Sequence, residues 1–257
     1  MTLANQIADL IDALAPIPPT PDGWAQAMEV LARYGVTAVN LGDAVTQTGE
    51  ILWMRSSMQD QWLSDYVGEG FYEVDPVVAG LREGASSMEM ALGQMARDTA
   101  EDRRAWELDH GMRAAGYATI FCQPFAGPKE GVGRLVNLTS DLSRDDFLAG
   151  DQDVILRTAM ALLAGKFGPG HLGDAGAADT LLYATQDGLA KVERLSDRER
   201  DVLRLLALGH MNARIADLLQ IAEVTVRAHL KSARRKLGAA TREQALAIAM
   251  ARGLITL

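Results

Sequence analysis

The stretch "VTVRAHLKSARRKL", residues 224–237, holds five Lys or Arg residues in fourteen positions. On a helical wheel of about 100° per residue, three apolar residues lie within about 40° of Val226: Leu230, Ala233 and Leu237. The cationic residues lie about 80° to 180° from Val226 on the same wheel: Arg227, Lys231, Arg234 and Arg235. The stretch therefore predicts a helix that packs by one face and presents positive charge on a neighbouring face.

Two helical patterns precede this stretch, and one follows it. The run "LSDRERDVLRLLALG", residues 195–209, begins with Ser196 and Glu199 at the spacing of a capping box. A short second pattern, "NARIADLLQ", covers residues 212–220, and a further helix is predicted over residues 241–255. Two helices joined by a turn of three or four residues, the second longer and basic, are typical of a helix-turn-helix.

A helix of this kind can enter the major groove of DNA with its cationic face. Arg227 and Lys231 lie early in the helix and are predicted to contact base edges, because the N-terminal residues of recognition helices reach deepest. Phosphate contacts are predicted for the other donors: Arg234, Arg235, Lys236, Thr225 and Asn212. The alternative is a solvated surface or a membrane-surface helix, against which the capped helices and the turn argue.

The rest of the chain carries the opposite charge. The 257 residues have a formal net charge of −9, although residues 192–257 hold twelve Lys or Arg against seven Asp or Glu. The C-terminal part is thus at +5, which leaves −14 for residues 1–191. Because nucleic acid repels an acidic surface, this division and the length of the chain predict two modules with different partners.

Composition argues against several classes of protein. Apolar residues make up 48% of the chain and charged residues 23%, as in globular proteins. No signal-peptide pattern or run of roughly 18 apolar residues is present, so a cytoplasmic location without a membrane partner is expected. Cys122 is the only cysteine, so no intramolecular disulfide is expected, and no metal site is predicted. An enzyme is not expected either, and a nucleophilic Cys122 paired with His110 is the alternative.

The N-terminal part is predicted to be a small antiparallel sheet covered by helices. Helical spacing marks two segments within residues 7–31, and strand-like runs form hairpins at residues 36–57 and 117–141. Helical patterns cover residues 59–116, and a long helix is predicted over residues 144–166.

These patterns predict an α+β chain with two domains. Residues 1–168 are predicted to form an α/β/α sandwich that senses a ligand. A linker is expected over residues 169–191, because its first part is rich in Gly and Ala. Residues 192–257 are predicted to form a four-helix domain that contains the helix-turn-helix.

The C-terminal runs "LSDRERDVLRLLALGHMNARIADLL" and "TVRAHLKSARRKLG" resemble the LuxR-type DNA-binding domain. By this resemblance Arg227 and Lys231 occupy the positions at which family members read bases. Ala222 departs from the family pattern, which usually has a Ser that caps the recognition helix there. Loss of such a cap typically costs about 1 kcal/mol, too little to abolish the fold.

The N-terminal module resembles the autoinducer-binding domain of quorum-sensing LuxR regulators. The runs "WLSDY" and "DPVV" supply Trp62, Tyr66 and Asp75 at the family spacing. The resemblance implies a transcription regulator controlled by a small signal molecule, with an N-acyl-homoserine lactone as the expected signal and no cofactor. Met58 and Met90 stand where the family usually has a Tyr and another aromatic residue, and they are expected to line the ligand site.

A lactone of this class offers groups that the matched side chains can bind. Asp75 is expected to accept the amide N–H, and Trp62 is expected to donate to the lactone carbonyl. Tyr66 would add a ring wall and a hydroxyl. Each residue also has a purely structural interpretation, because Trp and Tyr are usually core residues and an Asp before Pro commonly caps a helix.

Two kinds of regulator remain open, because thioethers give no hydrogen bond like that of a phenol. One responds to a lactone, and the other is a LuxR-like orphan that senses another metabolite or acts without a ligand. In either case a homodimer on an inverted-repeat site in double-stranded DNA is expected, with RNA polymerase as a further candidate partner.

Overall fold

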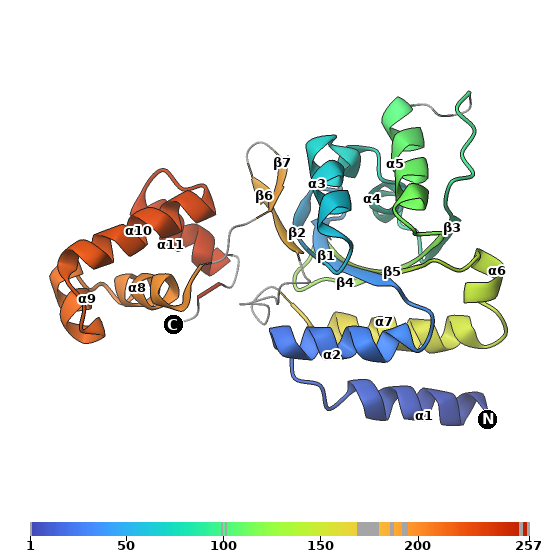
Figure 1. Cartoon of the computed structure of the whole chain (residues 1–257), viewed down its shortest axis with the longest axis horizontal. Coiled ribbons are helices and arrows are strands. Elements are labelled where there is room, and N and C mark those ends of the chain that lie inside the picture. Colours follow the sequence, from blue (N-terminus) through green and yellow to red (C-terminus); the bar gives the residue numbers. More distant parts are fainter. Residues whose placement is uncertain are drawn as a thin grey trace. The chain divides into compact units, whose positions relative to one another are not determined.

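The computed structural model describes residues 2–98, 100, 102–168, 180–185, 188–191, 195–251 and 254–255. The described residues form two compact units, shown in Figure 1. The first contains residues 2–168 together with strand β6 (Thr180–Thr185), and the second contains residues 195–251.

A seven-stranded sheet forms the middle layer of the first unit, with the strand order β3-β4-β5-β1-β2-β6-β7. The further strands are β1 (Ala38–Val45), β2 (Ile51–Ser56), β3 (Met88–Ala91), β4 (Thr119–Ala126), β5 (Val132–Ser140) and β7 (Gly188–Lys191). The pairs β1–β2, β1–β5, β4–β5, β3–β4 and β2–β6 are all antiparallel. The two hairpins predicted from the sequence, β1–β2 and β4–β5, therefore lie at the centre of the sheet.

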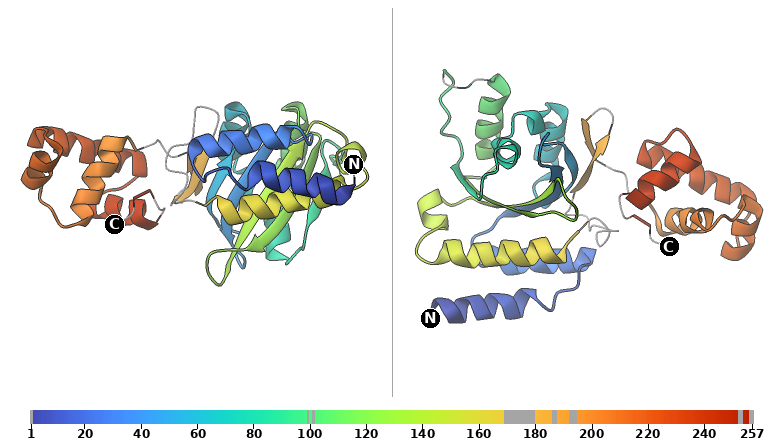
Figure 2. Two further views of the ribbon diagram at one scale, coloured as in Figure 1. Left: turned by 90° about the horizontal axis from the view of Figure 1, so that it is seen from below. Right: turned by 180° about the vertical axis from the view of Figure 1, so that it is seen from behind.

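Helices α2 (Pro21–Ala32) and α7 (Gln152–Lys166) cover one face of the sheet, and α1 (Leu3–Leu14) packs on the outer side of these two helices, as Figures 1 and 2 show. Thr20 caps α2 by accepting from the backbone N–H of Gly23, and Pro21 occupies the first turn, where no donor is needed. Trp24 meets Phe167 edge to face, with ring centroids 5.3 Å apart, and both rings are buried. This layer closes one side of the sheet with a packed core.

The helices on the other face are α3 (Asp60–Gly68), the 3-10 turn η1 (Phe71–Glu73), α4 (Pro76–Arg82) and α5 (Arg103–Ala114). A second apolar cluster fills the space between these helices and the sheet. Gly111 on α5 lies against the indole of Trp62, and a Cβ there would come within 2.7 Å of the ring. Only a glycine lets α5 pack this closely on Trp62, which fixes the width of the space.

Three sequence-based expectations differ from the structure of the first unit. The segment 59–116, expected to be helical, contains β3, a four-residue strand too short for its period to be recognised. The helix expected over 144–166 is divided into α6 (Arg144–Phe147) and α7, with Gly150 at a φ of +61° between them. The expected linker, 169–191, includes β6 and β7, and β6 pairs with β2; residues 169–179 of that linker lie outside the described residues.

The second unit contains helices α8 (Asp197–Ala207), α9 (Asn212–Leu219), α10 (Glu223–Leu237) and α11 (Arg242–Ala251). The capping box predicted for Ser196 and Glu199 is present, with both reciprocal hydrogen bonds formed. Val226, Leu230, Ala233 and Leu237 are all buried, as the wheel predicts. The predicted α+β fold, with a sandwich followed by a four-helix helix-turn-helix unit, is confirmed.

None of the helices in the described part of the chain combines the length and the apolar character that a bilayer span requires.

Candidate functional site

Asp75 and Tyr66 form a hydrogen-bonded pair on the helix-covered face of the first unit. Asp75 is the N-cap of α4, and its Oδ1 accepts from the backbone N–H of Val77 at 2.8 Å. Its Oδ2 accepts from the Tyr66 hydroxyl on α3, also at 2.8 Å. The carboxylate is therefore held between two helices, with lone pairs left for another donor.

Burial dominates the proton affinity of both groups. It raises the pKa of Asp75, partly opposed by the hydrogen bonds from Tyr66 and from the amides of Val77 and Val78. It also raises the pKa of Tyr66, and the neighbouring charge of Asp75 adds to that effect. Tyr66 is consequently the donor in the pair, and a ligand that donates to Asp75 would favour the ionised carboxylate.

Two cavities meet at Asp75. The larger, of about 360 Å³, lies among β3, α4 and α5, and its lining is mostly apolar, with Met90, Leu108 and Met112 among the contributors. The smaller, of about 30 Å³, lies against β1 and β5, and Tyr66 contributes to it as well. Small-molecule sites usually combine a concave apolar wall with a few placed polar groups, and this space has both.

Trp62 belongs to the same apolar cluster but lines neither cavity. Its ring stacks on Phe71 with centroids 5.9 Å apart and an interplanar angle of 21°. Its indole N–H makes no hydrogen bond to any residue in the described part of the chain. Trp62 therefore supports the wall of the site and keeps an unused donor.

The two methionines lie in different places. Met90, on β3, lines the larger cavity. Met58 is buried, and its sulfur accepts from Nδ2 of Asn40 at 3.4 Å. The structure thus places Met90 at the larger cavity, Tyr66 at the smaller one and Asp75 at both, whereas Met58 is buried beside Asn40 and lines neither.

Sequence reasoning missed two polar residues of this space, Asn40 on β1 and Asn137 on β5. Both line the smaller cavity. The signal was present in the sequence, because each Asn interrupts an apolar strand pattern. Only the pairing of the strands shows that the two side chains face the same space.

The thiol of Cys122 is fully buried beside this site. Burial raises the pKa of the thiol far above its usual value, and the charge of Asp75 adds to the shift. Because the thiolate is the reactive form, these surroundings disfavour a nucleophilic role for Cys122. His110 instead stacks on Trp106, with ring centroids 4.3 Å apart.

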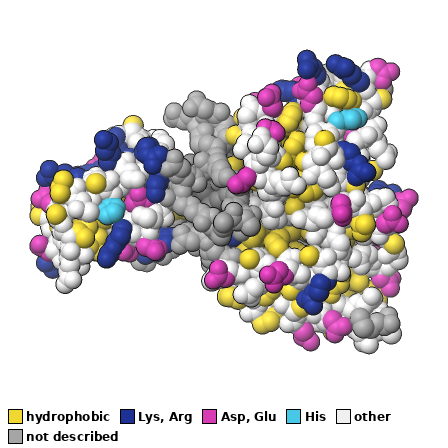
Figure 3. Space-filling view, viewed as in Figure 1, with side chains coloured by type: hydrophobic (Ala, Val, Ile, Leu, Met, Phe, Trp, Pro, Cys, Tyr) yellow, Lys and Arg dark blue, Asp and Glu magenta, His cyan; other side chains and the backbone are white. Residues whose placement is uncertain are grey.

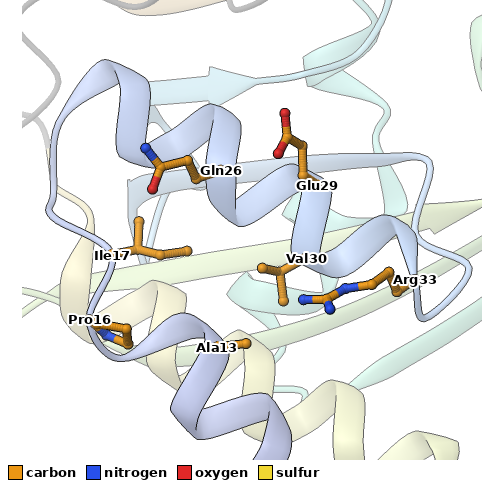
Figure 4. Close-up of a pocket in the computed structure, with 7 residues that line it drawn as sticks. All are labelled: Ala13, Pro16, Ile17, Gln26, Glu29, Val30 and Arg33. Carbon is orange, nitrogen blue, oxygen red and sulfur yellow. The ribbon is translucent and has the colours of Figure 1, made fainter.

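A third hollow, of about 520 Å³, lies between α1 and α2 and is shown in Figure 4. Ala13, Pro16 and Ile17 form one wall, and side chains of α2 form the other. It lies in the helix layer on the other face of the sheet, so it is separate from the cavities at Asp75 (Figure 1).

The exposed face of α10 carries the two residues predicted to read bases. Arg227 and Lys231 are both exposed, and the Arg227 guanidinium forms an ion pair with Glu223 one turn earlier. Val224, in the first turn, leaves 70% of its surface exposed although it is apolar. On the helical wheel Val224 lies about 20° from Lys231, on the side away from the core. Figure 3 shows Lys and Arg side chains at several places on the visible face of this unit, among acidic and apolar ones.

The residues predicted to contact phosphate have different surroundings. Lys236 donates to Oε2 of Glu199 at 2.8 Å, and its side chain is only 17% exposed. Arg234 donates to the carbonyl of Ala240, beyond the end of α10. Arg235 is exposed. The structure thus gives Lys236 and Arg234 contacts within the unit itself, beyond any contact with DNA.

The other two predicted phosphate donors lie at helix starts. Thr225 is half-buried in the first turn of α10. Asn212 begins α9, and its buried Oδ1 has no hydrogen-bond partner among the described residues.

Replacing Lys236 with Met is expected to lower the free energy of unfolding by about 1.5–3 kcal/mol, because Glu199 loses a charged hydrogen-bond donor. Burial alone would raise the pKa of Glu199, but hydrogen bonds from Lys236, Ser232 and the Ser196 amide hold it below its usual value. The matched variant Lys231→Met, at an exposed position of the same helix, is expected to leave stability almost unchanged and to weaken DNA binding. Urea denaturation and fluorescence anisotropy separate the two effects; a Lys236→Met protein of normal stability would contradict the structural role.

Comparison with known families accounts for both units. Residues 193–249 match the bacterial regulatory proteins of the luxR family, and residues 21–165 match the autoinducer binding domain. The second match alone covers more than half of the chain. The chain belongs to the LuxR family of quorum-sensing transcription regulators. Members of this family bind DNA and are not enzymes, so the helix-turn-helix unit is a DNA-binding domain and the sandwich is an autoinducer-binding domain.

Individual relatives agree with this membership. The chain is 26% identical over 222 residues to the quorum sensing-dependent transcriptional regulator VjbR of Brucella abortus, covering 84% of this chain and 78% of VjbR. It is 45% identical over 58 residues to the transcriptional activator RamA of Corynebacterium glutamicum, covering 23% and 21% of the two chains.

Solved structures of the family are more distant. SdiA of Escherichia coli is 18% identical with a TM-score of 0.45, and the match covers 100% of both chains. The N-acylhomoserine lactone dependent factor CepR2 of Burkholderia cenocepacia is 19% identical with a TM-score of 0.47, over 64% of this chain and 92% of CepR2.

Proposed function

We propose that the signal is an N-acyl-homoserine lactone, bound between the sheet and helices α3, α4 and α5. The observation that carries this proposal is the Asp75–Tyr66 pair, held at 2.8 Å beside a mostly apolar cavity of about 360 Å³. Asp75 retains lone pairs for the amide N–H of the ligand, and Trp62 retains an indole N–H for a carbonyl. The acyl chain would contact the apolar walls.

The two methionines would shape the head-group end of the site. Met90 presents a flexible thioether to the cavity, in place of a flat ring. Met58 is held by Asn40 and offers a ligand no hydroxyl. Fewer polar contacts at this end make Asp75 the principal polar anchor.

For DNA we propose that a homodimer reads an inverted repeat with two copies of α10. Arg227 and Lys231 would contact base edges, and exposed Val224 beside them would contact a thymine methyl group. Arg235 would contact phosphate, as would Thr225 and Asn212 at the starts of α10 and α9. Lys236 and Arg234 would contribute to the positive electrostatic potential that attracts DNA, while their contacts with Glu199 and Ala240 stabilise the C-terminal end of α10.

Ligand occupancy would regulate the protein by changing the population of dimers in which the two recognition helices have the correct spacing. A regulator of this kind acts where the chromosome is, so we place it in the cytoplasm. RNA polymerase is the partner through which a bound dimer would change transcription.

The test is thermal melting of the full chain with a panel of lactones of different acyl length. At a concentration of 100 times Kd, a bound lactone is expected to add about 2.7 kcal/mol to the free energy of unfolding. At least one member of the panel should therefore raise the Tm by several degrees. If no chain length raises the Tm, the lactone proposal is wrong and an orphan regulator with another signal is favoured.

Asp75→Asn is the variant that tests Asp75 as the polar anchor of the ligand. In the wild-type protein, lactone binding should depend on pH, because the pKa of Asp75 is raised. In the unliganded protein, the stability contributed by Asp75 is complete below the unfolded pKa and is lost as pH rises through the folded pKa. A lactone amide favours the ionised carboxylate, so the Tm increase caused by the lactone should shrink as pH falls toward the raised pKa. Asp75→Asn should bind weakly at every pH.

The matched control is Asp102→Asn, because Asp102 caps α5 by accepting from the amide of Arg104 at 2.7 Å and lines neither cavity at Asp75. It should keep the lactone response and its pH dependence. If both variants lost the lactone-induced increase in Tm equally, loss of a helix cap would explain the effect. The assignment of Asp75 as the polar anchor of the ligand would then be wrong.

A further inference from the structure

Asn40 and Asn137 are directly opposite each other in the sheet, and their row continues to both sides. Asn40 is paired with Ser56 on β2, and Asn137 is paired with Cys122 on β4. Residues paired in this way point to the same face of a sheet. On the face covered by α3, α4 and α5, Ser56, Asn40 and Asn137 therefore form a polar row, and both asparagines line the smaller cavity.

The side-chain oxygens of both asparagines lack partners. Oδ1 of Asn40 and Oδ1 of Asn137 are buried, and neither accepts a hydrogen bond from any described residue. Asn40 makes one weak contact through its other atom, Nδ2, to the sulfur of Met58 at 3.4 Å. A buried acceptor without a donor is costly, and native proteins rarely retain one without a reason.

The neighbours of the asparagines do not supply the missing donors. Ser56 is buried and its Oγ accepts from the backbone N–H of Met58 at 3.1 Å, but its hydroxyl makes no hydrogen bond to the side-chain oxygen of either asparagine. Tyr66 lines the same cavity, but its hydroxyl donates to Asp75. Two adjacent acceptors therefore border the smaller cavity without a protein donor.

We propose that the signal carries a hydroxyl group, and that its single O–H is shared between the side-chain oxygens of Asn40 and Asn137 in a three-centre hydrogen bond. The inference rests on the proposed function of the cavity at Asp75. Rotation about χ2, which is a broad torsion for Asn, turns either amide oxygen toward the ligand. The position on the ligand is the acyl chain near its amide group, because the smaller cavity shares Asp75 with the larger one.

The experiment compares three lactones of equal chain length by isothermal titration calorimetry with the full chain. Their third acyl carbons carry a hydroxyl, a carbonyl or only hydrogens. The hydroxyl compound is expected to bind roughly tenfold more tightly than the unsubstituted one, as one hydrogen bond to buried acceptors that otherwise lack a donor would provide. The carbonyl compound, which has an acceptor but no donor, should not share this gain.

Substitutions of the two asparagines test whether they cause the preference for the hydroxyl compound. Asn40→Leu and Asn137→Leu should each reduce the preference for the hydroxyl compound and strengthen binding of the unsubstituted one. Gln123→Leu is the matched control, because Oε1 of Gln123 is also buried without a partner, yet Gln123 follows Cys122 on β4 and faces the other side of the sheet. It should leave the preference intact.

The outcomes separate this inference from the proposed function. If lactones bind but the hydroxyl gives no advantage in the wild-type protein, the inference is wrong and the function stands. Equal affinity for the hydroxyl and carbonyl compounds would also overturn it, because the amides would then act as donors. If no lactone binds, the proposed function fails and the inference fails with it. The affinities of the three lactones for the wild-type protein test the inference even if a variant does not fold.

Discussion

Reversing the charges of Arg227 and Lys231 to Glu is expected to abolish sequence-specific DNA binding while the DNA-binding domain stays folded. Both side chains are exposed on α10, and neither contributes to the apolar core of the unit. A good base contact is worth about 1–3 kcal/mol, so loss of two contacts and added repulsion from phosphate should reduce affinity by at least about 100-fold. Fluorescence anisotropy at one fixed salt concentration, on sites selected from random DNA, measures the effect.

The matched control reverses Arg198 on α8 and Arg242 on α11, which are 55% and 50% exposed. This variant has the same change in net charge and should retain most of the affinity and all of the sequence preference. Circular dichroism must show that both variants are folded. Normal binding by the folded Arg227/Lys231 variant would refute α10 as the recognition helix.

Replacing Arg134 with Met is expected to destabilise the autoinducer-binding domain by about 3–5 kcal/mol, because it leaves the buried carboxylate of Asp43 without its cation. Arg134 holds Asp43 with two bonds, Nε at 2.7 Å and Nη2 at 3.0 Å. Its Nη1 also donates to the carbonyls of Ala164 and Phe167, at the end of α7, at 2.7 and 3.1 Å. The variant therefore loses an ion pair and a link between the sheet and α7.

Thermal melting should show a fall in Tm on the order of 10 °C for a domain of this size. Removing the charge as well, in Asp43→Asn with Arg134→Met, should recover part of the loss, because Trp53 can still donate its indole N–H to residue 43. Arg144→Met is the surface control: Arg144 is 50% exposed, and its ion pair with Glu89 should contribute at most about 1 kcal/mol. A similar fall in Tm for Arg134→Met and Arg144→Met would show that burial of the ion pair does not determine how much its loss destabilises the domain.

The DNA-binding domain followed from the sequence in detail because its signals are local. The capping box of Ser196 and Glu199 depends on residues three apart, and the buried stripe of α10 follows from the helical period. The N-terminal hairpins were also recognisable, because alternation and turn residues mark them. Strand β3 was not, because its four residues owe their conformation to pairing with β4.

The ligand site was only partly predictable. Asp75, Tyr66 and Trp62 were selected by their spacing, and the direct bond from Tyr66 to Asp75 could not be read from a nine-residue separation. Lys236 has a contact that the sequence did not reveal: its charge suggested DNA, and the structure also places Glu199, 37 residues earlier, close enough to bind it.

The sequence by itself determined the helices of the DNA-binding domain, the hairpins and the residue types available to a signal and to DNA, because these depend on near neighbours along the chain. The tertiary structure alone decided that Asn40 lies opposite Asn137, that Arg134 reaches Asp43 across 91 residues, and that Asp75 borders both cavities. The physical reason is that strand register and helix packing are set by the burial of the whole apolar core. No local pattern in the chain encodes which distant side chains that burial brings together.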